Sequence, residues 1–198
     1  MPDVRSFNRA LRQFAVLLAI AAVISLTSAA AAPLSVPVGG TARVVYQDRY
    51  ALLIGASEYG AGWARLRSVD TELDLLEATL TRQGFSVTRL RNPTSANLYS
   101  TMREFVVAHA DPNAAVMVVF SGHGWTDPQT HRGYIVPVNA PDPSTNRAAF
   151  LASALSMLQV QTLGNESEAM HTLFVFDSCF SGTVFTSRSS APPPPTDR

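Results

Sequence analysis

Apolar residues in this chain form uninterrupted runs separated by segments with helical spacing. The runs lie at residues 50–55, 85–90, 114–120 and 171–176. Runs of this length without polar interruption are typical of strands buried on both faces. Residues 43–46 are expected to lead into the first strand. A further short strand at 133–137 is expected at a sheet edge, because a proline suits an edge position.

Between the runs, apolar residues recur every three or four positions, as on one face of an amphipathic helix. The helices are expected from Ser68 to Gly84, from Thr94 or Ser95 to Asp111, and, with a weaker pattern, over residues 148–163. Strands separated by helices and apolar on both faces predict a three-layer α/β fold, with a mostly parallel sheet and helices on both faces. Ligands of such sheets bind beyond the carboxyl ends of the strands.

The amino-terminal segment has the layout of a signal peptide. Three arginines precede an uncharged apolar run at residues 14–26, and small residues follow. We expect cleavage within residues 29–32 and a periplasmic or secreted product without membrane contact; the alternative is an uncleaved anchor. The expected organisation is a signal peptide at 1–32, a linker at 33–43, one catalytic domain at 44–187 and a proline-rich tail at 188–198.

Composition excludes several classes of function. All 15 basic residues are arginines, so neither a Schiff-base lysine nor a P-loop lysine is available. The formal net charge of zero argues against a nucleic-acid partner, which would require a basic excess. The single cysteine, Cys179, forms no internal disulfide and no multi-thiolate metal site.

Cys179 and His123 each follow an apolar run directly. If the two strands are neighbours, both side chains emerge at the same sheet edge, where the histidine can serve as the base that a thiol nucleophile needs. The backbone N–H groups of Gly124 and Cys179 are candidates for an oxyanion hole. The alternative is that both residues are ordinary packed side chains.

These residues resemble the caspase-like cysteine peptidases of clan CD, especially the metacaspases and their bacterial relatives. Residues 50–55 resemble the family's first strand, Ser121-Gly122-His123-Gly124 its histidine motif, and Asp177-Ser178-Cys179-Phe180-Ser181-Gly182 its cysteine motif. The separation of His123 from Cys179 fits the roughly 50 residues noted for caspases. The resemblance covers about residues 44–185, which correspond to the large catalytic subunit, or p20 domain.

The resemblance implies a cysteine endopeptidase that cleaves a protein or peptide substrate after Arg or Lys. In metacaspases an acid matching Asp177 helps form an acidic S1 pocket, and Asp70 resembles a second pocket acid. A carboxylate beside the nucleophile favours a guanidinium group, in agreement with this assignment. Asp70 also falls in the first turn of a predicted helix, where the helix dipole alone favours an acid. The family's calcium-binding acids have no residue-by-residue match, so we predict no metal and no cofactor.

The chain departs from the family after Cys179, where the family continues into a small subunit with two further strands. We therefore expect a sheet that lacks those strands and that a second chain or a dimer could complete. The rival hypothesis is a catalytically inactive p20-only binding or regulatory protein, or a fragment of a larger one. Among the other polar residues, His109, His131 and His171 are expected to be structural, and Trp125 either walls a substrate subsite or packs a loop.

Overall fold

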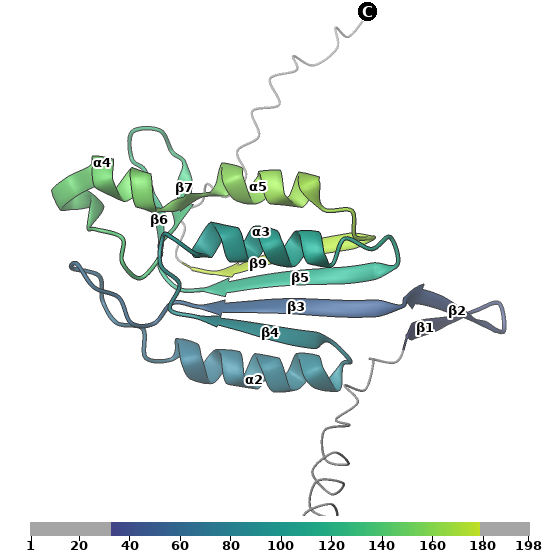
Figure 1. The fold of residues 1–198 in the computed structure, drawn as a ribbon. Coiled ribbons are helices and arrows are strands. Elements are labelled where there is room, and N and C mark those ends of the chain that lie inside the picture. The colour runs from purple at the N-terminus through teal and green to yellow at the C-terminus, as the bar shows by residue number, and fades with distance from the viewer. Residues whose placement is uncertain (1–32, 179–198) are drawn as a thin grey trace, which may run out of the picture. The chain divides into compact units, whose positions relative to one another are not determined.

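A parallel sheet lies at the centre of the part of the chain that the structure describes, residues 33–178 (Figure 1). The structure is a computed structural model. Within the described residues, the sheet has the strand order β4 (Ser86–Arg91), β3 (Asp48–Gly55), β5 (Ala114–Ser121) and β9 (His171–Asp177). Each neighbouring pair is parallel. The predicted α/β class and the four predicted strands of the sheet are confirmed.

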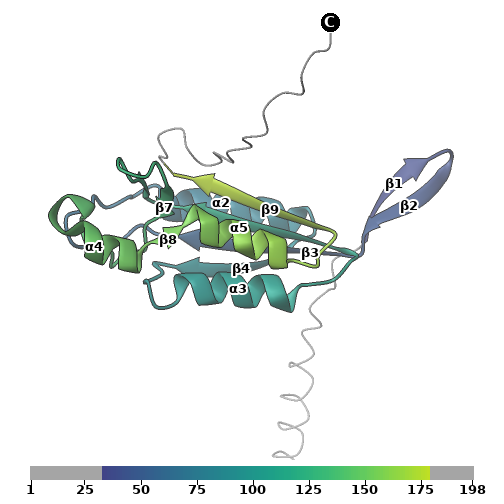
Figure 2. The ribbon, with the colours of Figure 1, turned by 90° about the horizontal axis from the view of Figure 1, so that it is seen from above.

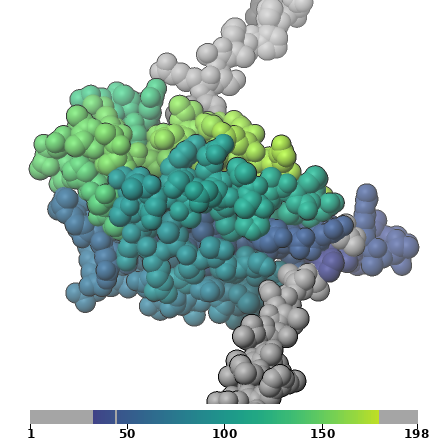
Figure 3. Space-filling view, in the orientation of Figure 1, coloured from purple at the N-terminus to yellow at the C-terminus, as the bar shows by residue number. Residues whose placement is uncertain are grey.

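Helices cover both faces of this sheet (Figures 1 and 2). Helix α2 (Val69–Arg82) lies on one face, and α3 (Leu98–Ala108) and α5 (Met157–Glu166) lie on the other. The space-filling view shows α3 and α5 side by side over their face (Figure 3). The three layers match the expected architecture.

Successive side chains of β3 point to opposite faces of the sheet, so this strand contacts both helical layers. Ala51 and Leu53 pack with the apolar face of α2, whereas Leu52 and Ile54 pack with α3 and α5. All four side chains are fully buried. Burying a leucine or isoleucine side chain completely is worth about 1.5–3 kcal/mol, so this strand fixes the position of both layers.

The order of the strands places the topological switch point of the sheet between β3 and β5. From β3 the chain moves outward to β4, returns across β3 to β5, and continues to β9 on the other side. The direction of winding therefore changes between β3 and β5. In open α/β sheets such a point, at the carboxyl edge, is where ligands bind.

A second, antiparallel sheet stands beside the carboxyl edge and was only partly predicted. In the described chain it has the order β6 (Gly124–Thr126), β7 (Gly133–Ile135) and β8 (Leu155–Ser156). The expectation of an edge strand at 133–137 is wrong, because β7 lies in the middle of this sheet. Pro137 lies beyond the end of β7, so its missing N–H interrupts no ladder.

The helix expected over residues 148–163 is in fact two helices. Helix α4 (Pro143–Ser153) ends before β8, and α5 begins after it. The side chain of Ser156 accepts the Gln159 N–H, and the Gln159 side chain accepts the Ser156 N–H. This capping box starts a new helix where the apolar spacing alone indicated a continuous one.

The segment expected to be a linker contains a β-hairpin. Strands β1 (Leu34–Val38) and β2 (Thr41–Tyr46) pair in antiparallel fashion across Gly39 and Gly40. These glycines have φ angles of 58° and 84°. A two-residue turn with both angles positive is the type that closes tight hairpins, and glycine adopts it without strain. Residues 43–46 therefore pair with β1 and do not extend the first strand of the main sheet.

Several predictions concern parts of the chain outside residues 33–178. They are the signal peptide at 1–32, the nucleophile Cys179, the last part of the domain up to residue 187 and the tail at 188–198. Among the described residues, no helix is long and apolar enough to cross a membrane. Strand β9 forms one edge of the sheet as described, and its Leu173 and Val175 side chains are exposed. A second chain that completes the sheet stays a prediction.

Candidate active site

Adjacent strands bring the residues that precede the two predicted catalytic positions in the sequence to one edge of the sheet. Strands β5 and β9 are hydrogen-bonded neighbours, and Ser121 at the end of β5 is directly opposite Asp177 at the end of β9. In the sequence, His123 follows Ser121 by two residues, and Cys179 follows Asp177 by two residues. The dyad was predicted on the condition that the two strands are neighbours, and the structure meets this condition. Cys179 itself lies outside the described residues, which end at Ser178.

The imidazole of His123 is held between two aromatic rings and a backbone carbonyl. Its ring centroid lies 4.6 Å from that of Tyr59 and 5.2 Å from that of Trp63. Its Nε2 lies 2.8 Å from the carbonyl oxygen of Ala64. A carbonyl can only accept a hydrogen bond, so Nε2 carries the hydrogen. The neutral ring therefore presents Nδ1 as its basic nitrogen.

Tyr59 fixes the backbone on which His123 is carried. The His123 N–H donates to the Tyr59 hydroxyl at 2.7 Å, and that hydroxyl donates to the carbonyl of Val136 at 3.1 Å. Burial raises the pKa of Tyr59 well above its usual range, so the phenol remains a donor. On the other side, the Val136 N–H donates to the carbonyl of His123 at 3.1 Å. The loop is thus held through both peptide groups of the histidine.

Gly122 allows the approach of Tyr59 to this loop. A Cβ atom at Gly122 would lie 2.6 Å from the Tyr59 hydroxyl and 2.8 Å from the ring of Phe120. Real Cβ atoms do not come this close to their neighbours, so a glycine is needed for steric reasons. Gly122 therefore leaves room for the tyrosine hydroxyl.

Asp177 is oriented by the residue that precedes the Gly-His pair. The Ser121 hydroxyl, which is nearly buried, donates to Oδ2 of Asp177 at 3.2 Å. The Gly122 N–H donates to the Asp177 carbonyl, also at 3.2 Å. The Asp177 residue is exposed, so its carboxylate can meet a ligand at the edge of the sheet. Sequence reasoning missed the role of Ser121, although the strand register would have identified it.

Asp70 lies at the same edge of the sheet, on the side of β3 and β4. It is in the first turn of α2, as predicted. Its Oδ2 accepts the Ser57 hydroxyl at 3.1 Å, and its Oδ1 accepts Arg91 Nη1 at 3.3 Å. The same Ser57 hydroxyl also lies 3.2 Å from Oδ1 of Asn92. This network gives Asp70 partners within the protein and shares its charge with an arginine, and its role as a pocket acid stays a prediction.

Gly124, the predicted oxyanion donor on the histidine side, is the first residue of β6. It is paired with Ile135 of β7, next to the loop that carries His123. Its amide is therefore fixed close to the imidazole by the second sheet. The other predicted donor is the amide of Cys179, which lies beyond the described residues.

A family model described as the caspase domain matches residues 48–195. The chain belongs to the caspase-domain family. The match begins with β3 and includes His123 and Asp177, and it extends through Cys179. Membership supports cysteine peptidase chemistry in general. No curated protein matches the chain.

Two of the other three histidines of the caspase domain contact neighbouring side chains, and the third lies in an exposed turn. His109 at the end of α3 stacks on Tyr50 with ring centroids 4.0 Å apart, and its Nδ1 lies 2.8 Å from the Phe105 carbonyl. His171 begins β9, at the end of the strand remote from Asp177, and its Nδ1 lies 3.1 Å from the Tyr46 hydroxyl. His131 occupies a turn with a φ angle of 56°.

Acidic residues of the caspase domain do not gather into a metal site in the region that the structure describes. No group of three or more His, Cys, Asp or Glu side chains there could hold an ion. The acids at the carboxyl edge instead accept hydrogen bonds from protein groups, as Asp70 and Asp177 do. The prediction that the chain uses no metal remains a prediction.

Proposed function

We propose that this chain is an exported cysteine endopeptidase of the metacaspase type, with Cys179 as the nucleophile and His123 as the acid–base group. The observation that carries the proposal is the hydrogen bond between Nε2 of His123 and the carbonyl of Ala64. It leaves Nδ1 as the base on the strand end next to the one that precedes Cys179.

The chemistry follows from this arrangement. Nδ1 of His123 takes the thiol proton, and the thiolate attacks the carbonyl carbon of the scissile bond. When the carbon–nitrogen bond breaks, Nδ1 returns the proton to the leaving amine. A water molecule then gives a proton to Nδ1 and attacks the thioester, which releases the acid and restores the thiol. The carbonyl of Ala64 stabilises the imidazolium that forms twice in this cycle.

Two backbone amides would stabilise the oxyanion of each tetrahedral intermediate. They are the N–H groups of Gly124 and Cys179, and one such donor contributes about 3 kcal/mol in well-studied acyl transfer. Gly124 is suited to this role because β6 and β7 fix its peptide next to the histidine loop.

The carboxylate of Asp177 supports specificity for Arg or Lys before the scissile bond. Ser121 orients it at the end of β9, two residues before the nucleophile. A guanidinium or ammonium group there would form a charge-assisted hydrogen bond, whereas an acidic side chain would be repelled. Asp70 contributes less to this preference, because Arg91 already pairs with it.

The test is hydrolysis of fluorogenic peptides that differ only in the residue before the scissile bond, with Arg, Lys, Leu and Asp compared. Cys179→Ala and His123→Ala are expected to abolish hydrolysis, whereas Ser181→Ala, a neighbouring hydroxyl, serves as the matched control. A thiol-directed peptidyl inhibitor should add its mass at Cys179, which is the sole cysteine of the chain.

Three outcomes would contradict parts of the proposal. Hydrolysis that survives Cys179→Ala would refute the dyad. Preference for Asp before the scissile bond would refute the acidic pocket. Absence of both hydrolysis and labelling would favour the rival function, a p20-only binding or regulatory protein.

A further inference from the structure

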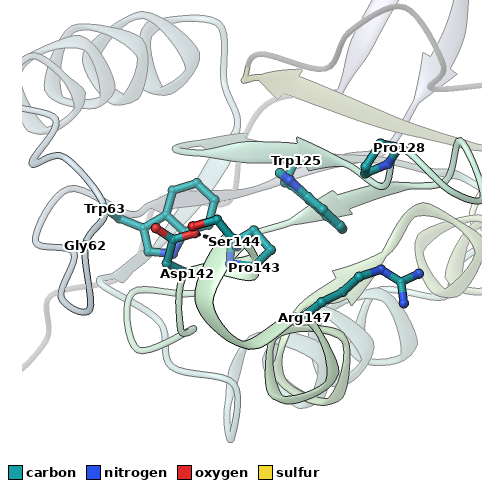
Figure 4. Close-up of a pocket in the computed structure, with 8 residues that line it drawn as sticks. All are labelled: Gly62, Trp63, Trp125, Pro128, Asp142, Pro143, Ser144 and Arg147. Atoms are coloured by element: carbon teal, nitrogen blue, oxygen red, sulfur yellow. Dashed lines mark hydrogen bonds between the residues drawn. The ribbon is translucent and has the colours of Figure 1, made fainter.

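A pocket with aromatic walls lies beside His123 and has no role in the chemistry described above. Its volume is about 390 Å³, within the range of pockets that hold small ligands. Figure 4 shows Trp63 on the left and Trp125 nearer the centre, with Pro128 beyond it. Trp63 lines the pocket and also contacts the candidate active site, because its ring packs on the imidazole of His123. An occupant of the pocket would therefore lie one aromatic ring away from the catalytic histidine.

The walls of the pocket are rigid and apolar. Two prolines, Pro128 and Pro143, complete the surface that the two tryptophans begin. Phe150, which is fully buried, packs against both indole rings, with centroids 6.1 Å from Trp63 and 4.7 Å from Trp125. The indole N–H of Trp63 already donates to the carbonyl of Ala140 at 3.1 Å. These rings are held in place by neighbouring groups and line the pocket with apolar surface.

The charged residues of the pocket are engaged within the protein. Asp142 caps α4 by accepting the Ser144 N–H at 2.7 Å. Arg147 binds the buried Asp127 with both Nη2, at 2.6 Å, and Nε, at 3.2 Å. The charge of the Arg147 guanidinium is therefore compensated by Asp127, and the Asp142 carboxylate accepts a hydrogen bond from the neutral Ser144 amide. Burying a charged side chain among the apolar walls is costly, which favours an uncharged occupant.

We propose that this pocket is a substrate subsite on the leaving-group side of the scissile bond, and that it takes an aromatic or large aliphatic side chain. The inference rests on the proposed function. His123 must reach the leaving nitrogen to protonate it, so the peptide passes His123 on its leaving side. The pocket lies beyond Trp63, whose ring centroid is 5.2 Å from that of His123. Since an extended peptide advances about 3.3 Å per residue, we assign the pocket to the second or third residue after the scissile bond.

The chain offers a direct probe of this pocket, because both of its tryptophans line it. We would titrate full-length Cys179→Ala protein with Arg-containing peptides that carry Phe, Leu, Gly, Asp or Lys at the second or third position after the Arg. Phe and Leu peptides are expected to change the tryptophan emission and to bind about tenfold more tightly than the Gly peptide. Equal affinity for all five peptides, or a preference for Asp or Lys, would overturn the inference.

Kinetics on the unmodified protein give the second readout. The same peptides should show about a tenfold higher kcat/KM with Phe than with Gly, and Trp125→Ala should remove this difference. Trp125→Phe, which keeps an aromatic wall, should retain most of it. Leu158→Ala, at an exposed leucine of α5, is the control for loss of an apolar side chain elsewhere. Discrimination that survives Trp125→Ala in a folded protein would assign the preference to another surface.

The two readouts separate this inference from the proposed function. Emission changes with Phe peptides in the Cys179→Ala protein, together with no hydrolysis of any peptide by the unmodified protein, would support an apolar peptide pocket and refute the peptidase. Hydrolysis that depends on Cys179 but shows no preference on the leaving side would support the peptidase and refute the subsite.

Discussion

The hydroxyl of Tyr59 holds the loop that carries His123, and Tyr59→Phe removes that hydroxyl while keeping the ring. Two hydrogen bonds are lost at once, the one accepted from the His123 N–H at 2.7 Å and the one donated to the Val136 carbonyl at 3.1 Å. The aromatic contact with the imidazole remains. The substitution therefore tests the positioning of His123 separately from its chemistry.

The cost in stability follows from the two backbone groups that lose a partner. A buried polar group without a hydrogen bond costs about 1–3 kcal/mol. Val136 is fully buried, whereas the half-buried His123 can recover part of the loss from water. We expect a loss of roughly 2 kcal/mol in the free energy of unfolding. For a domain of this size that corresponds to a fall in Tm of roughly 4–8 °C.

The expected effect on catalysis is a fall in kcat of about tenfold with little change in KM, because misplaced acid–base groups raise the barrier without altering substrate binding. Peptide hydrolysis should be measured well below the Tm of the variant. Since burial holds the pKa of Tyr59 above its usual range, the tyrosine does not titrate between pH 5 and 9, and the pH profile should keep its shape. Tyr99→Phe, at a half-buried tyrosine of α3, is the matched control. An unchanged kcat in a variant with lowered Tm would refute the positioning argument.

Three further substitutions test other parts of the site and its support. Gly122→Ala should lower stability by about 1–3 kcal/mol and reduce kcat, because its Cβ would displace the Tyr59 hydroxyl; unchanged thermal unfolding would contradict this. Asp177→Asn should reduce kcat/KM for Arg peptides by about tenfold or more and leave that for Leu peptides nearly unchanged, and equal losses on both would remove Asp177 from the pocket. Asp127→Asn should cost about 2–3 kcal/mol at pH 7 in denaturant unfolding. The hydrogen bond from Arg147 holds the pKa of Asp127 well below its usual range, so this stabilisation is present above about pH 4 and is lost as the pH falls further. A difference between variant and parent that stays constant down to pH 2 would contradict the assignment.

The parts of the fold that the sequence predicted are those in which burial on both faces leaves a simple pattern. Strand β5 had to be apolar throughout because helices cover both sides of it, and α2 had to repeat its apolar residues every three or four positions because only one face packs on the sheet. The ends of β5 and β9 were visible for the same reason, and with them the candidate positions His123 and Asp177.

The elements that were missed depend on local signals that compete with this pattern. Gly39 and Gly40 specify a tight hairpin, and Leu34, Val36 and Val38 alternate with other residues along β1, but the strand is short, contains a proline and leaves these side chains exposed. Ser156 and Gln159 divide a continuous apolar spacing into two helices through a capping box.

The partners of His123 could not be predicted, because they are set by tertiary contact. Tyr59 precedes His123 by 64 positions, and Ala64 by 59. Ala64 contributes its backbone carbonyl, which every residue has. The residue type at position 64 therefore could not indicate this contact. The position of Tyr59 is recognisable only once β3 and β5 are known to be neighbours.

Three consecutive residues at the end of β5 face three different partners, and this explains why they form a motif. Ser121 orients Asp177 across the strand pair, Gly122 leaves room for Tyr59, and His123 turns its Nε2 to Ala64. Each residue type is required by a separate contact, so none can substitute for another. In the proposed mechanism, specificity, loop position and acid–base chemistry therefore depend on neighbouring residues of one strand end. Because they share that strand end, a shift of β5 against β3 or β9 would disturb all three functions together.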